Sequence, residues 1–106
     1  MAYNINITEE AQEDLNQIFD YISKHFLASQ AATNTLENIR LTILKLEEFP
    51  EIGVDVSERL KKKFSDEVKL RMLITGHYLV FYIFENSTIT ILRVLYQKRN
   101  FIEIFS

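Results

Sequence analysis

The spacing of apolar residues changes once along this chain, and that change limits the folds it can adopt. Between residues 11 and 46 apolar residues recur every three or four positions, which is the period of an amphipathic helix. Between residues 68 and 97 they alternate or run together, which is typical of strands. A block of helices followed by a block of strands predicts an α+β fold rather than alternating α/β units.

Two helices are predicted, preceded by a short strand at residues 3–7. Thr8 is suited to cap the first helix, and Ser29 the second, which Pro50 ends. So short a break between the helices favours an antiparallel hairpin. His25, near the end of the first helix, is interpreted as structural. The expected inward-facing residues are Ala11, Leu15, Ile18, Phe19, Ile22 and Phe26 in the first helix, and Ala32, Leu36, Ile39, Ile43, Leu44 and Leu46 in the second.

Three strands are predicted after a polar loop at residues 54–67, which has room for one helical turn. Residues 68–74 alternate, residues 77–84 are nearly all apolar as in a central strand, and residues 89–97 form the third run. Tight turns between them make an antiparallel meander. The sequence therefore predicts one α+β domain over residues 1–106 with the order β-α-α-β-β-β. The helical hairpin packs on one face of a mainly antiparallel sheet of about four strands, and the other face stays partly open.

Composition excludes several classes of protein. The 106 residues include no cysteine, so neither a disulfide framework nor a cysteine-ligated metal site can form. The two histidines have no ligand partners at helical spacing, and the two glycines form no phosphate loop, so no metal and no cofactor are expected. No signal peptide and no apolar run of membrane-spanning length is visible, which predicts a soluble cytoplasmic protein without a membrane partner.

The net charge of −3 hides two oppositely charged halves. Residues 1–58 carry three basic and eleven acidic side chains, whereas residues 59–106 carry nine basic and four acidic ones. A basic surface can meet a nucleic acid or an acidic protein segment. The candidate cations on or beside the sheet, with the arginines expected on its open face, are Lys69, Arg71, Arg93, Lys98 and Arg99.

Each candidate also has a structural interpretation. Lys69 and Arg71 are also consistent with solvated residues on an open face. Arg93 lies inside an apolar strand and needs either a partner or a path to water, so an ion pair would also explain it. Tyr78, Tyr82 and Tyr96 are candidate stacking or acid–base groups, although a tyrosine in a central strand is usually part of the core.

Taken together, the segments resemble the RelE/ParE toxins over essentially the whole chain. The matching stretches are Tyr3-x-Ile5, Thr8-x-x-Ala11-x-x-Asp14-Leu15-x-x-Ile18, Tyr21-Ile22, Leu46-x-x-Phe49-Pro50-x-x-Gly53, Arg71-Met72-Leu73, Tyr78-Leu79-Val80-Phe81-Tyr82 and Ile91-Leu92-Arg93-Val94-Leu95-Tyr96-Gln97-Lys98-Arg99. The resemblance implies the toxin of a type II toxin–antitoxin module, a family often described as plasmid stabilisation proteins. It also implies a cognate antitoxin that wraps and blocks the toxin in a hetero-oligomer.

The family resemblance leaves two mechanisms open. RelE-like members cut messenger RNA in the ribosome without a metal, whereas ParE-like members bind DNA gyrase and have no known hydrolytic role. Arg71 and Arg99 match arginines of RelE-like toxins, but Tyr78 stands where those toxins carry another arginine. Phe105 stands near their catalytic tyrosine and has no ionisable hydroxyl. If the chain were RelE-like, the catalytic candidates would be Lys69, Arg71, Arg99, Tyr82 and Tyr96.

The strand motifs look more ParE-like, so growth inhibition by gyrase binding is the favoured reading. The alternatives are a ribosome-dependent endoribonuclease and a degenerate, non-toxic family member. The expected target-binding residues are Arg71, Arg93, Lys98 and Arg99. The apolar ending is expected to be covered by the antitoxin through Phe101, Ile102, Ile104 and Phe105.

Overall fold

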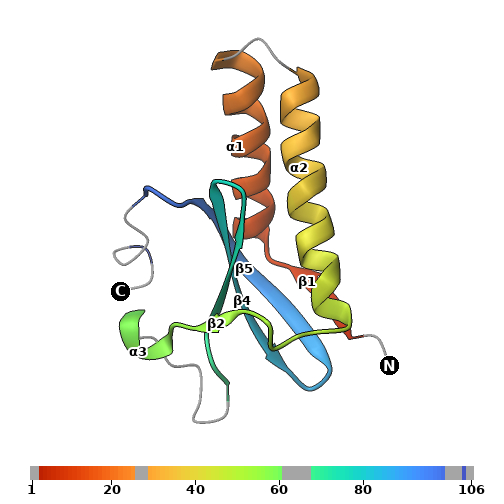
Figure 1. Cartoon of the computed structure of the whole chain (residues 1–106), viewed down its shortest axis with the longest axis vertical. Coiled ribbons are helices and arrows are strands. Elements are labelled where there is room, and N and C mark those ends of the chain that lie inside the picture. Colours follow the sequence, from red (N-terminus) through yellow and green to blue (C-terminus); the bar gives the residue numbers. More distant parts are fainter. Residues whose placement is uncertain (1–2, 26–28, 61–67, 100–103, 105–106) are drawn as a thin grey trace.

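The computed structural model describes residues 3–25, 29–60, 68–99 and 104. In chain order its elements are β1 (Asn4–Ile7), α1 (Glu9–His25), α2 (Ser29–Leu44), the short 3-10 helix η1 (Lys45–Glu47), β2 (Val54–Asp55), α3 (Ser57–Leu60), β3 (Arg71–Thr75), β4 (Tyr78–Glu85) and β5 (Thr88–Tyr96). Figure 1 shows α1 and α2 side by side above the sheet. The predicted α+β architecture, with a helical hairpin on the sheet, is confirmed.

The sheet has five strands in the order β1-β5-β4-β3-β2. β3, β4 and β5 form the predicted antiparallel meander, and β4 lies at the centre. β1 pairs with β5 in parallel, with Ile5 opposite Ile89 and Ile7 opposite Ile91. The first strand of the chain therefore pairs with the last, and β1 lies at one edge of the sheet.

The strand count and one boundary differ from the prediction. About four strands were expected, but Val54 and Asp55 form an additional two-residue strand opposite Met72 and Arg71. This strand lies in the segment predicted as a loop, because two residues are too few for a period to show. The same segment does contain the helical turn α3. β3 begins at Arg71 rather than Val68, although Val68 is buried.

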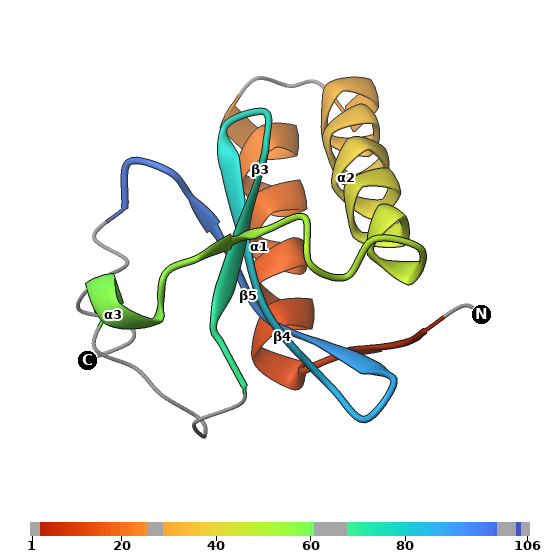
Figure 2. The ribbon, with the colours of Figure 1, turned by 60° about the horizontal axis from the view of Figure 1, so that its bottom comes forward.

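Two apolar clusters lie on opposite faces of the sheet. The larger cluster packs the inward stripes of α1 and α2 against residues such as Val80, Tyr82, Ile91 and Val94. The smaller one covers part of the reverse face, where Val56, Val68, Leu70 and the partly buried Ile104 surround Leu79, Phe81, Ile83 and Leu95. Figure 2 shows the helical hairpin on one side of the sheet and α3 on the other. The reverse face remains bare at Val54 and Ile74, each 63% exposed.

The predicted helix positions are largely confirmed. Ala11, Leu15, Ile18 and Ile22 are buried in α1, and Ala32, Ile39, Ile43 and Leu46 are buried in α2 and η1. Phe19 and Leu44 are each 37% exposed and so lie at the margin of their stripes. Phe26 lies outside the described residues. No helix in the described part of the chain is long and apolar enough to cross a membrane.

Thr8 joins the start of α1 to the sheet. Its Oγ1 accepts a hydrogen bond from the Ala11 N–H at 3.1 Å and donates one to the Leu92 carbonyl at 3.1 Å. Replacing Thr8 with alanine should lower the free energy of unfolding by about 1 kcal/mol, since the helix loses its cap. Urea denaturation measures this, with Thr8→Ser as a control that retains the hydroxyl. An alanine variant as stable as the wild type would contradict the capping role.

Candidate functional site

Arg93 is held in an ion pair at the interface between α1 and β5. Its Nε donates to Asp14 Oδ2 at 2.7 Å and its Nη2 donates to Asp14 Oδ1 at 2.9 Å. The Val94 N–H also donates to Asp14 Oδ2, at 3.0 Å, beside a β-bulge that leaves Leu92 without a partner on β4. The Asp14 side chain is 6% exposed and that of Arg93 is 20% exposed. Hydrogen bonding to Asp14 raises the pKa of Arg93 above its usual value, so the guanidinium stays charged.

Arg71 lies on the face of the sheet that carries the helices, not on the reverse face. It stands opposite Tyr82 in the β3–β4 register. Its Nη1 donates to the Gly53 carbonyl at 2.8 Å and to the Glu51 carbonyl at 3.3 Å. Arg71 therefore fastens the turn before β2 to the sheet.

Tyr82, on β4, binds the same turn through its hydroxyl. It is fully buried, and its hydroxyl donates to the Pro50 carbonyl at 2.8 Å and accepts from the Gly53 N–H at 2.9 Å. Burial raises the pKa of Tyr82 above its usual value. A phenol that is enclosed, hydrogen-bonded and harder to ionise is badly suited to exchange protons with a substrate.

Lys69 lies near β2, where its partner Asp55 stands opposite Arg71 in the β2–β3 register. Its Nζ is 3.8 Å from Asp55 Oδ2, and both side chains are well exposed. A hydrogen bond from the Ser57 N–H lowers the pKa of Asp55 below its usual value, with a smaller contribution from Lys69. So exposed a pair contributes little to stability.

A cleft of about 780 Å³ opens between α1 and the ends of β4 and β5. We call it the aromatic cleft, because three tyrosines and one histidine line it together with an arginine: Tyr21, Tyr78, Tyr96, His77 and Arg99. The rings of Tyr78 and Tyr96 meet edge to face with centroids 5.8 Å apart. Burial raises the pKa of Tyr78. Tyr21 stacks on His25 at 4.1 Å, which agrees with a structural role for that histidine.

Two cations of the predicted set lie at the end of β5, on the surface. Lys98 and Arg99 are exposed, and neither forms an ion pair within the part of the chain that the structure describes. Arg99 lines the aromatic cleft beside Tyr96. An exposed guanidinium beside aromatic rings can bind a carboxylate or a phosphate while the rings supply apolar contact.

The predicted site residues therefore fall into three places. Arg71 and Tyr82 lie at the turn before β2, Arg93 lies beneath α1, and Tyr96, Lys98 and Arg99 lie at or beside the aromatic cleft. Of the predicted antitoxin-binding residues, Ile104 packs against the smaller cluster. Phe101, Ile102 and Phe105 lie outside the described residues.

Sequence reasoning missed three residues that shape these places. Asp14 lies on the apolar stripe of α1, and an acid at such a position is a sign of a buried partner. Tyr21 and His77 were not connected with Tyr96, because nothing in the spacing brings a helix, a turn and the last strand together. Their convergence appears only in the folded chain.

A comparison with known protein families finds a match over most of the chain. The model described as "ParE toxin of type II toxin-antitoxin system, parDE" matches residues 5–101. Among curated proteins, none matches the sequence.

Solved toxin–antitoxin structures share the fold. A chain of the chromosomal ParDE system from P. aeruginosa is 18% identical and aligns with a TM-score of 0.69, covering 90% of this chain and 96% of that chain. A chain of the archaeal RelE–RelB complex from Pyrococcus horikoshii OT3 is also 18% identical, with a TM-score of 0.53 and coverages of 93% and 99%. For a chain of the RelBE2 complex from Mycobacterium tuberculosis the identity is 18%, the TM-score 0.51 and the coverages 91% and 99%.

Proposed function

Because this chain belongs to the ParE toxin family and is the toxin of a type II toxin–antitoxin module, we propose that it inhibits growth by binding DNA gyrase. The family match supports this reading, together with the ParE-like motifs in β4 and β5. The proposed partners are the cognate antitoxin, which blocks the toxin in a hetero-oligomer, and gyrase as the target.

The observation that carries the proposal is the separation of the candidate nuclease groups. Tyr82 is enclosed, Arg71 donates to backbone carbonyls and Lys69 pairs with Asp55, whereas Tyr96 and Arg99 lie at the aromatic cleft. General acid–base cleavage needs a proton carrier and cations within hydrogen-bond reach of one phosphate. A binding toxin needs only an accessible surface, and the aromatic cleft with Lys98 and Arg99 offers one.

Gyrase inhibition should depend on the cations beside the aromatic cleft. In a supercoiling assay, the double variant Lys98→Ala/Arg99→Ala should need about tenfold more protein than the wild type for the same inhibition, since it loses two charged contacts. Arg40→Ala is the matched control, because it removes an exposed arginine on α2. Unimpaired gyrase at micromolar wild-type toxin would contradict the proposal.

One observation favours a second candidate function. Arg99, Tyr96, Tyr78 and His77 share the aromatic cleft, and such a set could stack a base and hold a phosphate. A ribosome-dependent endoribonuclease would leave cut messages, so primer extension after induction separates the two functions. Intact transcripts alongside growth arrest would exclude the nuclease, and normal growth without the antitoxin gene would point to a degenerate toxin.

A further inference from the structure

The three tyrosines that line the aromatic cleft come from three different elements. Tyr21 lies on α1, Tyr78 begins β4 and Tyr96 ends β5. Tyr78 and Tyr96 stand opposite each other in the β4–β5 register. Burial raises the pKa of Tyr78, and the nearby phenol groups of Tyr96 and Tyr21 raise it further. The fold therefore gathers the three rings around the same space.

Two of these rings are open to solvent, although the backbone around them is held in place. Tyr21 is 54% exposed and Tyr96 is 44% exposed. The Gln97 N–H donates to the His77 carbonyl at 2.9 Å, and the Arg99 N–H donates to the Tyr96 carbonyl at 2.9 Å. These hydrogen bonds join the end of β5 to the β3–β4 turn. Exposed aromatic rings on a fixed backbone can bind a partner at a low cost in conformational entropy.

The charges along the cleft differ between its two ends. Asp14, which lines one end, is already paired with Arg93. Glu10 and Glu13 lie at the same end. The Glu10 Oε2 is 3.9 Å from the Arg93 Nη1, and the charges of Glu10 and Glu13 add to the hydrogen bond from Asp14 in raising the pKa of Arg93. At the other end Arg99 lines the cleft, and it has no ion pair within the residues that the structure describes.

This distribution of charge favours a protein segment over a nucleic acid. A guanidinium beside aromatic rings suits a carboxylate whose neighbour is an aromatic or aliphatic side chain. A nucleic acid carries a negative charge at every nucleotide, so a strand that followed the cleft would also meet the acids Glu10 and Glu13. A protein segment can place its negative charge at the Arg99 end alone and remain neutral at the other end.

We propose that the aromatic cleft binds a segment of the target protein in which an acidic residue stands next to an aromatic or aliphatic one. The carboxylate of the segment pairs with Arg99, and the neighbouring side chain packs on the rings of Tyr21 and Tyr96. The identification of the target as gyrase rests on the proposed function. The chemistry of the bound segment rests on the residues of the cleft.

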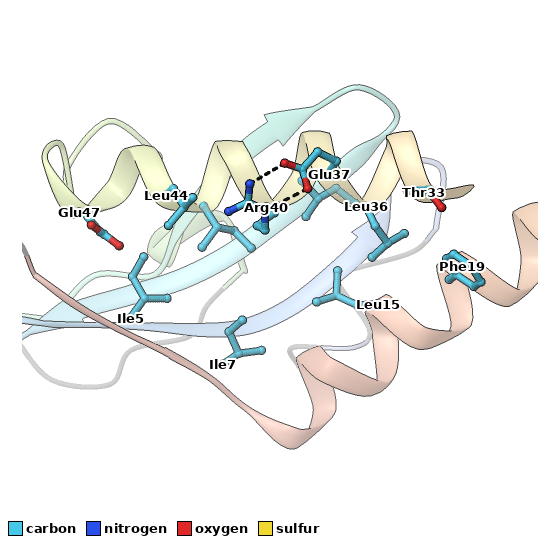
Figure 3. Close-up of a pocket in the computed structure, with 12 residues that line it drawn as sticks. Ile5, Ile7, Leu15, Phe19, Thr33, Leu36, Glu37, Arg40, Leu44 and Glu47 are labelled. Carbon is cyan, nitrogen blue, oxygen red and sulfur yellow. Dashed lines mark hydrogen bonds and ion pairs between the residues drawn. The ribbon is translucent and has the colours of Figure 1, made fainter. Parts of the chain in front are cut away.

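A second depression, between β1 and the helical hairpin, supplies matched control residues. Figure 3 shows Phe19 and Arg40 there, with dashed lines that join Arg40 to Glu37. Phe19 lies on the same helix as Tyr21 and is 37% exposed, and neither Phe19 nor Arg40 lines the aromatic cleft. Phe19→Ala and Arg40→Gln therefore remove the same kinds of side chain as cleft variants do, but at another place.

Three probes test the binding chemistry on the full-length toxin without gyrase. The first is a short peptide in which one phenylalanine is flanked by glutamates, the second has glutamines in place of the glutamates, and the third is a short RNA oligonucleotide. In a titration followed by the NMR signals of the tyrosine rings, the glutamate peptide should bind about tenfold more tightly than the glutamine peptide, and Arg99→Gln should abolish this difference. Equal binding of the two peptides, or tighter binding of the RNA, would overturn the proposal.

Inhibition of supercoiling by the free toxin should depend on the same residues. Tyr96→Ala and Arg99→Glu should each need about tenfold more protein than the wild type for the same inhibition, whereas Phe19→Ala and Arg40→Gln should stay within about twofold of it. Arg99→Glu should inhibit less than Arg99→Gln, because the new carboxylate repels the carboxylate of the segment. Urea denaturation of each variant separates a loss of binding from a loss of the fold.

The outcomes separate this proposal from that of the target. If the variants of Arg99 and Tyr96 inhibit gyrase as strongly as the wild type, this proposal fails and gyrase remains the target. If the wild-type toxin leaves gyrase unimpaired but binds the glutamate peptide through Arg99, the target proposal fails and this one stands. An Arg99→Glu toxin that loses affinity for the antitoxin but inhibits gyrase fully would assign the cleft to the antitoxin, and would also overturn this proposal.

Discussion

Replacing Asp14 with alanine should lower the free energy of unfolding by about 3 kcal/mol, because it leaves the mostly buried Arg93 side chain with only the exposed Glu10, 3.9 Å away, as a counter-charge. Asp14 accepts three hydrogen bonds, two from Arg93 and one from the Val94 N–H, and each of these donors would lose its partner. The loss should appear as a lower urea midpoint with an unchanged slope. It should equally appear in Arg93→Ala, which leaves the carboxylate buried.

Removing both charges separates the contribution of the ion pair to the free energy of unfolding from that of the packing around it. Asp14→Leu/Arg93→Met replaces both groups with apolar side chains of similar size, and we expect it to be more stable than either single variant. Glu37→Ala is a suitable control, since it breaks an exposed ion pair on α2 and should cost less than about 1 kcal/mol. The matched single variants for a double-mutant cycle are Asp14→Leu and Arg93→Met, and a double variant whose loss equals the sum of these two losses would show that the charges do not act on each other.

Gly53→Ala should also destabilise the protein, by about 2 kcal/mol, because the site has no room for a methyl group. A Cβ built at Gly53 would lie 2.5 Å from the Tyr82 hydroxyl oxygen and 2.7 Å from Tyr82 Cε1. Since Tyr82 is fully buried in the central strand, its ring has little freedom to withdraw. Thermal and urea unfolding of the alanine variant measure the loss.

Tyr82→Phe distinguishes the clash from the hydrogen bonds. Phenylalanine loses the bonds to Pro50 and Gly53, at a cost of about 1–3 kcal/mol, but it relieves the contact at the hydroxyl. In the Tyr82→Phe background, Gly53→Ala should therefore cost clearly less than it does in the wild type. An alanine penalty that is the same in both backgrounds would show that the hydroxyl is not the obstacle.

Periodicity and turn chemistry were sufficient for most of the fold. The stripe of Ala11, Leu15, Ile18 and Ile22 gave α1 its buried face, because helical spacing is a local property. The unbroken apolar run from Tyr78 to Phe84 identified β4 as central, with residues buried on both faces. Among turns, Glu85 to Thr88 was correctly placed, and Asn86 and Ser87 adopt the positive φ angles of a tight hairpin.

The contacts that define the site depend on residues far apart in the chain, and this is why they were missed. The partner of Arg93 lies 79 positions away, so Asp14 and Arg93 each stand in an apolar stretch but no local pattern joins them. Arg71 alternates with its neighbours as expected, but the added strand β2 and its preceding turn are what give it backbone partners. The sequence shows which residues are basic, but only the folded chain shows which of them form ion pairs or hydrogen bonds.

The parallel pairing of β1 with β5 has a consequence for when the toxin can fold during its synthesis. β1 is synthesised first, and its partner β5 is synthesised only after about eighty intervening residues. Structures dominated by such distant contacts gain their native order late, since the entropy lost in closing the loop comes before the contacts that offset it. A nascent chain that ends before β5 would therefore lack the completed sheet, and the fold could form only after the last strand has been made.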